Sequence, residues 1–225
     1  MLKEPALLNL LQLASPTLPV GAYSYSEGLE TLVDSGIINH QNNLFSWLEN
    51  ELLFGSIRIE TVVMLRAYTC LTNNNLTELN NWNNWLSAAR ETKELRQQSH
   101  QMGQSLLKLL LDLQPKLQFL LKVIEHECNY AIAFGIAASF WQINREATTM
   151  SYLHSWLTNI INSGVKTIPL GQTAGQKLLL EMQPLILKTT AEIMTITDKE
   201  IASCSWGLSF ASMEHETQYS RLFRS

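Results

Sequence analysis

The sequence is poor in the residue types and spacings from which most active sites are built. Charged residues account for 16% of its 225 residues, against about 25% in an average soluble domain. The three cysteines, Cys70, Cys128 and Cys204, are far apart, odd in number and never part of a CxxC motif. This usage argues against a disulfide framework and favours reduced thiols in a cytosol.

The sequence also lacks long apolar runs and an excess of positive charge. Its most apolar stretch, residues 106–124, is interrupted by three lysines, an aspartate and a proline, so it does not predict a transmembrane helix. Residues 1–5 lack the features of a signal peptide. The net charge of −4 gives no electrostatic footprint for nucleic acid. We therefore expect a cytoplasmic protein that binds no membrane and no nucleic acid, and whose apolar-rich surface is partly covered by other proteins.

Metal-ligand spacings are missing as well. The five histidines are isolated and form no HxxxH pair. The best local cluster is His126-Glu127-Cys128, but adjacent residues of a helix point in different directions and rarely meet at one ion. Satisfied polar groups at a helix junction are the simpler interpretation, and the same two interpretations apply to residues 214–216. We expect no metal ligand.

Motifs for phosphate binding and nucleophilic catalysis fail on spacing. In residues 171–177 (GQTAGQK) the two glycines are one position closer together than in the pattern GxxxxGK[ST], the lysine does not directly follow the second glycine, and no strand is expected before them. A Pro-Gly turn into a tightly packed helix explains this segment. No GxSxG occurs, and no cysteine has an identifiable histidine and acid partner. We therefore expect no catalytic and no cofactor-binding residue. Organic cofactors need no short motif, however, so a helical-bundle enzyme that holds one is the alternative.

Apolar residues recur with the period of a helix along almost the whole chain. The pattern predicts an all-α fold, a single helical-bundle domain of about nine or ten helices, with residues 1–211 as the body and 212–225 as its C-terminal tail. Residues 72–84, rich in asparagine, predict a loop or a short helix that Trp82 and Trp85 hold against the body. The other expected helices cover residues 7–13, 43–54, 56–71, 86–113, 116–127, 130–140, 149–162, 172–181, 184–196 and 198–211.

One stretch, residues 15–30 (SPTLPVGAYSYSEGLE), concentrates prolines, glycines, hydroxyls, aromatics and carboxylates. We call it the opening motif. Its prolines stiffen the loop. Ser24 and Glu27 have the spacing of a capping box, which predicts a helix start pinned by their mutual hydrogen bonds. The helix that follows is expected to bury one apolar face and to carry an acidic stripe on another. The apolar face consists of Leu29, Leu32 and Val33, and the stripe of Glu27, Glu30 and Asp34.

The last residues form a second unusual segment. Tyr219, Leu222 and Phe223 lie at i, i+3 and i+4 and are expected to share one face of a helix, with Arg221 and Arg224 pointing elsewhere. Chain ends usually fray. An aromatic, amphipathic end of this kind predicts a segment that becomes ordered in the groove of a partner protein.

Four segments resemble those of one protein family. Residues 15–30 resemble the N-terminal signature of the urease accessory protein F family (UreF), a Leu-Pro-x-Gly turn followed by aromatic, serine and Gly-Leu-Glu residues. Residues 89–96, with Met102 and Gly103, are similar to the family's central arginine–glutamate helix, residues 165–176 to its Lys-x-x-Pro-Leu-Gly-Gln segment, and residues 215–225 to its C-terminal signature. Tyr25 stands where many members have a histidine, which argues against a direct metal role there.

The resemblance implies an all-α, non-catalytic chaperone that acts in urease maturation, where the nickel site of urease is assembled. Members of the family pair with accessory protein D (also called H). Together these two proteins recruit the GTPase accessory protein G to the urease apoprotein, and the F protein is thought to regulate that GTPase and to gate nickel delivery. The resemblance also implies a homodimer, and hence an assembly of two D and two F chains.

The resemblance assigns contact residues in the tail. The tail matches the segment with which members engage protein D. We therefore expect Tyr219 and Phe223 to be anchors buried in that partner, with Leu222 beside them. Arg221 and Arg224 are expected to form charge-assisted hydrogen bonds with it.

The opening motif and Lys166 are the candidates for the surface that faces the GTPase. Glu27, Glu30 and Lys166 are expected to be polar contacts there, and Tyr23 an aromatic one. Three of them have an alternative role within the chain. Glu27 fits a helix cap, Tyr23 fits core packing, and Lys166 fits a helix-terminal charge that meets the helix dipole.

Overall fold

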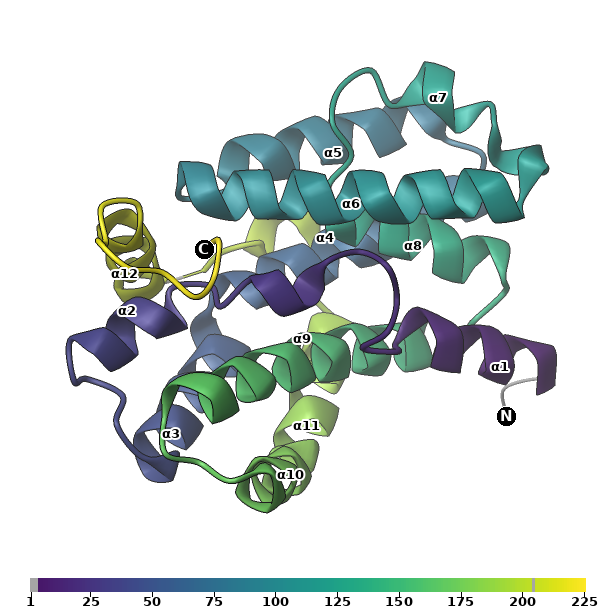
Figure 1. Cartoon of the computed structure of the whole chain (residues 1–225). Helices are drawn as coiled ribbons and strands as arrows, with labels where there is room; N and C mark the ends of the chain where they lie inside the picture. Colours follow the sequence, from purple (N-terminus) through teal and green to yellow (C-terminus); the bar gives the residue numbers. More distant parts are fainter. Residues whose placement is uncertain (1–3, 204) are drawn as a thin grey trace.

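The computed structural model describes residues 4–203 and 205–225 and consists of helices joined by loops (Figure 1). Within these residues it contains twelve α-helices and no strand, so the predicted all-α fold is confirmed with more helices than expected. None of the described helices is long and apolar enough to cross a membrane. The helices are α1 (Glu4–Leu13), α2 (Leu29–Asp34), α3 (Gln41–Phe54), α4 (Ser56–Thr72), α5 (Leu76–Ala89), α6 (Lys93–Leu113), α7 (Leu120–Val123), α8 (Tyr130–Phe140), α9 (Arg145–Thr167), α10 (Gln172–Glu181), α11 (Gln183–Ile193) and α12 (Trp206–His215), with three short 3₁₀ helices, η1 (Ala22–Ser24), η2 (Pro115–Leu117) and η3 (Asp198–Glu200).

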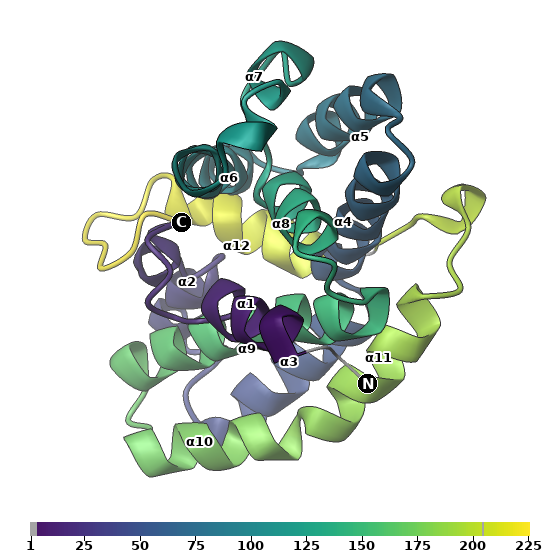
Figure 2. The ribbon, with the colours of Figure 1, turned by 90° about the vertical axis from the view of Figure 1, so that its right-hand side faces the viewer.

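The centre of the fold is α8, which packs against α4 and α6 (Figure 2). Residues 131–138 of this helix are all buried, as its uniformly apolar sequence predicts. Small residues allow the close packing: a Cβ atom added at Gly135 would lie 2.3 Å from the carbonyl oxygen of Met64 on α4. The buried helix fixes the positions of α4 and α6, and these carry side chains of the candidate site.

The helix predicted over residues 86–113 is in fact two helices. α5 and α6 are separated at residues 90–92, where Arg90 has an extended backbone with ψ of 127°. The hydroxyl of Thr92 then caps α6 by accepting the backbone N–H three residues on, at 3.2 Å. The break turns the Arg90 side chain inward to an ion pair with Glu60, a tertiary contact that periodicity does not reveal.

Other boundaries differ in smaller ways. The asparagine-rich segment is mostly the helix α5, whose start is capped by Asn75. Trp82 packs against the core, whereas Trp85 is 40% exposed. Of the residues 116–127 expected to be helical, only the end of η2 and the four residues of α7 are. Lys166 lies in the last turn of α9, as predicted.

Two cysteines are buried free thiols, in agreement with the reduced state expected from the sequence. Burial raises the pKa of the Cys128 thiol to about 12, so this thiol is a poor nucleophile. Cys204, the third, lies outside the described residues.

Charged side chains are buried between the helices beneath the opening motif. The Glu60 carboxylate pairs with Arg90 and accepts a hydrogen bond from the hydroxyl of Tyr152 at 3.1 Å. On α3, burial raises the pKa of the Glu51 carboxyl to about 8, and the negative charges of Glu27 and Glu91 add to this effect. The core therefore contains a carboxyl group that keeps its proton near neutral pH.

Glu51→Gln should make the stability of the fold less dependent on pH. The folded chain keeps the Glu51 proton over the range in which the unfolded chain has released it, so the Glu51 contribution to stability falls between pH 4.5 and pH 8. At roughly 1.4 kcal/mol per pKa unit, the variant should exceed the wild type by a few kcal/mol at the upper end of this range. Urea denaturation at both ends measures the difference.

Glu49→Gln, on the same helix, is the control for removing a carboxylate as such. A stability difference between the Glu51 variant and the wild type that is equal at the two pH values would contradict the prediction.

Candidate functional site

The opening motif turns sharply before α2 and does not form the predicted capping box. Glu27 and Gly28 both have a positive φ, 53° and 77°, which is uncommon for a residue with a side chain. Gly28 precedes α2 and gives it no side-chain cap. Ser26 contributes instead, because its Oγ accepts the backbone N–H of Glu30 at 3.4 Å. The turn directs the Glu27 side chain inward, away from the helix start.

The Glu27 carboxylate is buried beneath the motif and is held by two donors. Gln98 Nε2 on α6 donates to Oε1 at 2.7 Å, and Trp156 Nε1 on α9 donates to Oε2 at 2.8 Å. Burial raises the pKa of this carboxyl, and the nearby Glu60 adds to the shift. Glu27 is thus neither a helix cap nor part of an exposed stripe: it joins the motif to α6 and α9.

The Glu30 carboxylate is also buried, and it holds the C-terminal tail. Its Oε1 accepts the backbone N–H of Leu222 at 2.6 Å, and its Oε2 accepts that of Phe223 at 2.9 Å. Hydrogen bonds to a carboxylate are stronger than neutral ones. The predicted acidic stripe is therefore wrong, since Asp34 alone of its three members is exposed. The apolar face of α2 does pack inward as predicted.

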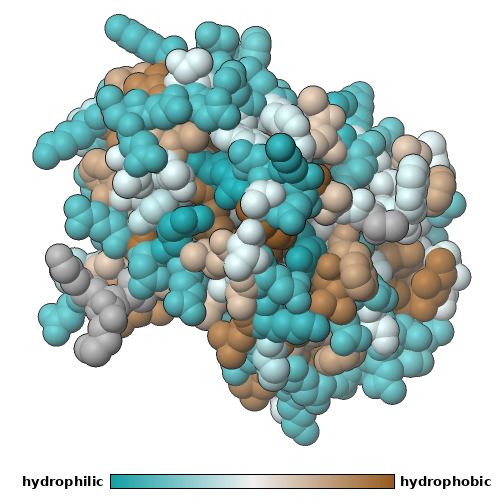
Figure 3. All heavy atoms as spheres, turned by 180° about the vertical axis from the view of Figure 1, so that it is seen from behind, coloured by the Kyte–Doolittle hydropathy of each residue, from teal (hydrophilic) through white to brown (hydrophobic). Residues whose placement is uncertain are grey.

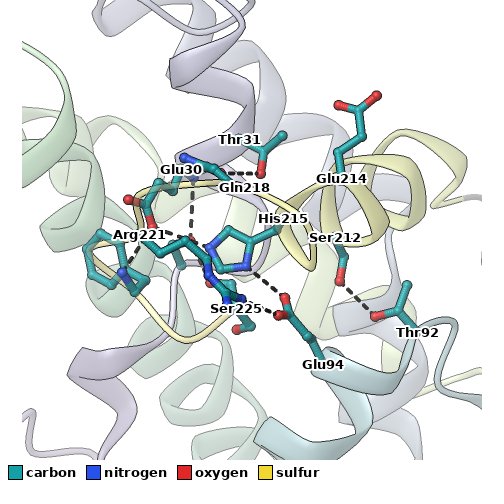
Figure 4. A network of polar contacts seen from close by, with 12 residues as sticks. Glu30, Thr31, Thr92, Glu94, Ser212, Glu214, His215, Gln218, Arg221 and Ser225 are labelled. Carbon is teal, nitrogen blue, oxygen red and sulfur yellow. Dashed lines mark hydrogen bonds and ion pairs between the residues drawn. The ribbon is translucent and has the colours of Figure 1, made fainter.

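His215 completes this buried network (Figure 4). The imidazole is fully buried at the end of α12. Its Nε2 lies 3.3 Å from Glu30 Oε2, and its Nδ1 lies 2.7 Å from Glu94 Oε2. Arg221 Nη1 in turn pairs with Glu94 Oε1 at 3.0 Å. We call these four residues the tail clasp, because they join α2, α6 and α12 to the tail.

The last two residues lie along the opening motif (Figure 1). The N–H of Arg224 donates to the carbonyl of Ser24 at 2.8 Å. Ser26 donates to the main-chain oxygen of Ser225 through its N–H at 2.8 Å and its hydroxyl at 2.6 Å. The Ser225 hydroxyl donates to Gln98 Oε1 at 2.6 Å, and this same amide holds the carboxylate beneath the motif. The tail and the motif therefore form one unit.

Beyond α12 the tail is not helical, so the predicted helical face of Tyr219, Leu222 and Phe223 is wrong. Phe223 is only 5% exposed within its own chain. Lys166 Nζ lies 5.3 Å from the centre of the Phe223 ring, within the range of a cation–π contact. Phe223 thus anchors the tail to the body, next to the last turn of α9.

Most of the predicted contact residues face solvent. Tyr23 is 69% exposed, Tyr219 is fully exposed and Leu222 is 64% exposed. Core packing is thereby excluded for Tyr23. The nine predicted contact residues thus divide into an exposed group and a buried group, and the buried residues support the surface from below. The exposed group is Tyr23, Lys166, Tyr219, Arg221, Leu222 and Arg224, and the buried group is Glu27, Glu30 and Phe223. We call the exposed group the motif–tail surface.

A cavity of about 260 Å³ adjoins this surface. Tyr23 and Lys166 contribute to its lining, as do the buried charged groups Glu27, Glu60 and Arg90. Burial alone would lower the pKa of the Arg90 guanidinium, but Glu60 and other carboxylates raise it above its ordinary value. The cavity is therefore lined by a fixed positive charge and by carboxyl groups.

Metal chemistry finds no support in the described residues. Among these residues, no group of three or more His, Cys, Asp or Glu side chains could hold a metal ion. The candidate cluster 126–128 is dispersed, because Cys128 is buried and the carboxylate of Glu127 pairs with His100. In the other candidate, residues 214–216, the histidine belongs to the tail clasp.

Sequence reasoning missed three residues of the site. The sequence leaves His215 open between a metal ligand and a satisfied polar group, without naming its partners, and it does not single out Glu94 or Gln98. Each of the three forms its hydrogen bonds with partners more than 70 positions away in the chain. No spacing between neighbouring residues therefore predicts these contacts. The resemblance of residues 89–96 and 215–225 to family segments is the one signal that includes Glu94 and His215, and Gln98 lies outside those segments.

Fold and site together define a class: an all-α protein that presents an ordered loop-and-tail surface on a helical body. Comparison with known proteins then gives the family. Residues 38–183 match the family model described as UreF. The urease accessory protein UreF of Nostoc sp. is 61% identical over 218 residues, which cover 97% of this chain and 95% of the relative. The UreF proteins of Microcystis aeruginosa and Synechocystis sp. are 60% and 52% identical over the full length of both chains.

The chain belongs to the UreF family of urease accessory proteins, as the four sequence segments predicted. Its role therefore lies in the maturation of urease.

Glu30→Gln should loosen the tail without unfolding the body. One of the two carboxylate oxygens becomes an NH₂ group, which cannot accept the backbone N–H that the oxygen accepted. Losing a hydrogen bond to a charged group costs about 1.5–3 kcal/mol. The amides of Leu222 and Phe223 should exchange with deuterium roughly ten- to a hundredfold faster, at about 1.4 kcal/mol per factor of ten, while those of α8 keep their protection.

Asp34→Asn is the matched control, because it removes a carboxylate from the same helix at an exposed position. Unchanged exchange in the tail of the Glu30 variant would show that the clasp does not hold the tail.

Proposed function

We propose that this chain acts as a non-catalytic scaffold in the assembly of the nickel site of urease. It binds accessory protein D (or H), recruits the GTPase accessory protein G to the urease apoprotein and regulates that GTPase. The observation that carries the proposal is the motif–tail surface. Aromatic and cationic side chains are exposed there on a backbone that buried hydrogen bonds hold in place.

The two halves of this surface suit two partners. The tail exposes the aromatic ring of Tyr219, the apolar side chain of Leu222 and two arginines, a composition typical of interface anchors. We assign this half to protein D. The opening motif contributes Tyr23, and α9 contributes Lys166, to a neighbouring patch that we assign to the GTPase. Glu27 and Glu30 are buried, and in this proposal they hold the motif and the tail in place beneath the exposed contact residues.

The shared hydrogen bonds couple the two halves. Tail residues and motif residues bond directly to one another, and Gln98 bonds to both. A partner that binds the tail therefore stabilises the conformation of the motif as well, because the two form together. In this way protein D is expected to favour binding of the GTPase.

Further apolar surface suits a protein that works inside an assembly. Trp206, Phe210 and Met213 of α12 are 71%, 60% and 52% exposed and lie at i, i+4 and i+7 of one helix. On the face seen in Figure 3, hydrophobic residues lie in separate patches among hydrophilic ones. These features support contact of α12 with another protein. A homodimer in the cytoplasm, within an assembly of two D and two F chains, is what the family resemblance implies.

The alternative function, a helical-bundle enzyme with an organic cofactor, is favoured by one observation, the cavity beside Tyr23. Its volume of about 260 Å³ is close to the lower limit of ordinary ligand sites, about 300 Å³. Mass spectrometry of the purified protein under native conditions decides between the two functions. A stoichiometric organic ligand would contradict the scaffold proposal.

Tyr219→Ala combined with Leu222→Ala should weaken binding to protein D. Both side chains are largely exposed, so their loss removes contact area without breaking the tail clasp. Truncating anchors of this kind costs about 1–2 kcal/mol each, which corresponds to a loss of affinity of tenfold or more in calorimetry. The matched control is Leu180→Ala, an equally exposed leucine on α10. Affinity equal to that of the wild type would remove the tail from the D interface.

Lys166→Ala should reduce recruitment of the GTPase to the D–F complex about tenfold or more, the effect of losing one charged anchor. Binding of protein D should remain. The control Lys177→Ala removes an exposed lysine from the neighbouring helix α10, and deuterium exchange at Phe223 checks that the loss of the cation–π contact leaves the tail in place. Pull-down with tagged protein D measures recruitment. Normal recruitment by the alanine variant would take Lys166 out of the GTPase surface.

A further inference from the structure

A second cluster of reactive side chains joins α5, α6 and the loop before α8. The Oγ of Ser87 lies 2.9 Å from Nε2 of His100, and Nδ1 of the same imidazole lies 2.8 Å from Oε2 of Glu127. None of the three belongs to the motif–tail surface. No sequence motif connects them, because they lie on three separate elements.

Their order is that of a nucleophile, a base and an orienting acid. A carboxylate bonded to one nitrogen of an imidazole fixes its tautomer and orientation, so that the other nitrogen is free to accept a proton from a hydroxyl. Partial burial lowers the pKa of His100, although Glu127 acts in the opposite direction. The neutral imidazole, which is the form that accepts a proton, therefore predominates near neutral pH.

The surroundings of Ser87 hold its oxygen in place. Asn129 Nδ2 donates to the Ser87 Oγ at 2.7 Å. The carbonyl of Asn83, one turn earlier in α5, lies 3.0 Å from the same Oγ, and helical serines commonly donate to this carbonyl. The single hydroxyl proton serves either Asn83 or His100. When it faces His100, Ser87 is set up as a nucleophile.

The cluster is open to solvent through a surface groove. Ser87, His100 and Glu127 all line this groove, together with Asn84 and Arg96. Asn84 and Arg96 contribute an amide and a guanidinium to this lining, and N–H groups of these kinds stabilise an oxyanion.

We propose that Ser87, His100 and Glu127 form a nucleophilic serine centre that is acylated by small activated esters. The Ser87 Oγ forms a bond to the acyl carbon, its proton passes to His100 Nε2 and then to the leaving alkoxide, and the ester C–O bond breaks. Water then cleaves the acyl-serine with His100 as base, which releases the carboxylic acid and restores the hydroxyl. This reactivity is independent of the scaffold function, since it uses none of the proposed partner contacts.

A fluorophosphonate probe tests the centre in the full-length chain. The Ser87 Oγ forms a bond to phosphorus, the P–F bond breaks, and the proton passes through His100 to solvent. Peptide mass spectrometry should find the label on Ser87, with none on Ser87→Ala and at least tenfold slower labelling of His100→Gln. Excess p-nitrophenyl acetate should acetylate the same serine.

Ser105 is the internal control, because its hydroxyl also donates to the carbonyl one turn earlier, at 2.8 Å. Ser87 labelling no faster than Ser105 labelling, or insensitive to His100→Gln, would overturn the proposal. Circular dichroism checks that the variants fold. Binding of protein D, measured in parallel, separates this test from that of the scaffold function, since Ser87→Ala should bind it normally.

Discussion

The buried carboxylate of Glu30 is the constraint on which the site depends. An ionised group taken out of water costs several kcal/mol unless partners replace the lost hydration. Here the partners are two backbone amides of the tail and the imidazole of His215. None of them is local to α2, so Glu30 is satisfied only when α2, α12 and the tail are assembled together. The arrangement of the surface is therefore cooperative.

Glu27 and Glu30 lie three positions apart, a spacing that on one helix would place both on the same side. The positive φ of Glu27 prevents this, because the chain turns before α2 begins. One carboxylate enters the body beside Gln98 and Trp156, while the other faces the tail. Since Gln98 also bonds to Ser225, the two carboxylates belong to a single network. The backbone turn is thus what allows one short motif to support two separate contacts.

What the sequence could predict follows from which interactions are local. The sequence predicts helices over residues 130–140 and 172–181, which match α8 and α10 to the residue, because the apolar pattern of a helix and the turn residues beside it act within a few positions. The break at Arg90 depends on Glu60, 30 positions away, and the clasp joins Glu30 to His215 across 185 positions. Contacts between residues that far apart produce no periodic pattern in the sequence. The family resemblance identifies the candidate site residues, but it does not predict which of them are buried.

Burial of the clasp changes how the tail is expected to work. A frayed tail that folds in a partner's groove must lose its conformational entropy on binding. In this structure the tail is ordered against its own body, so that cost is met when the chain folds. Tyr219 and Leu222 are then presented to a partner from a backbone already in place. Under the proposed function, the affinity of the tail for its partner depends on Glu30 and His215, two buried residues that hold the tail from below.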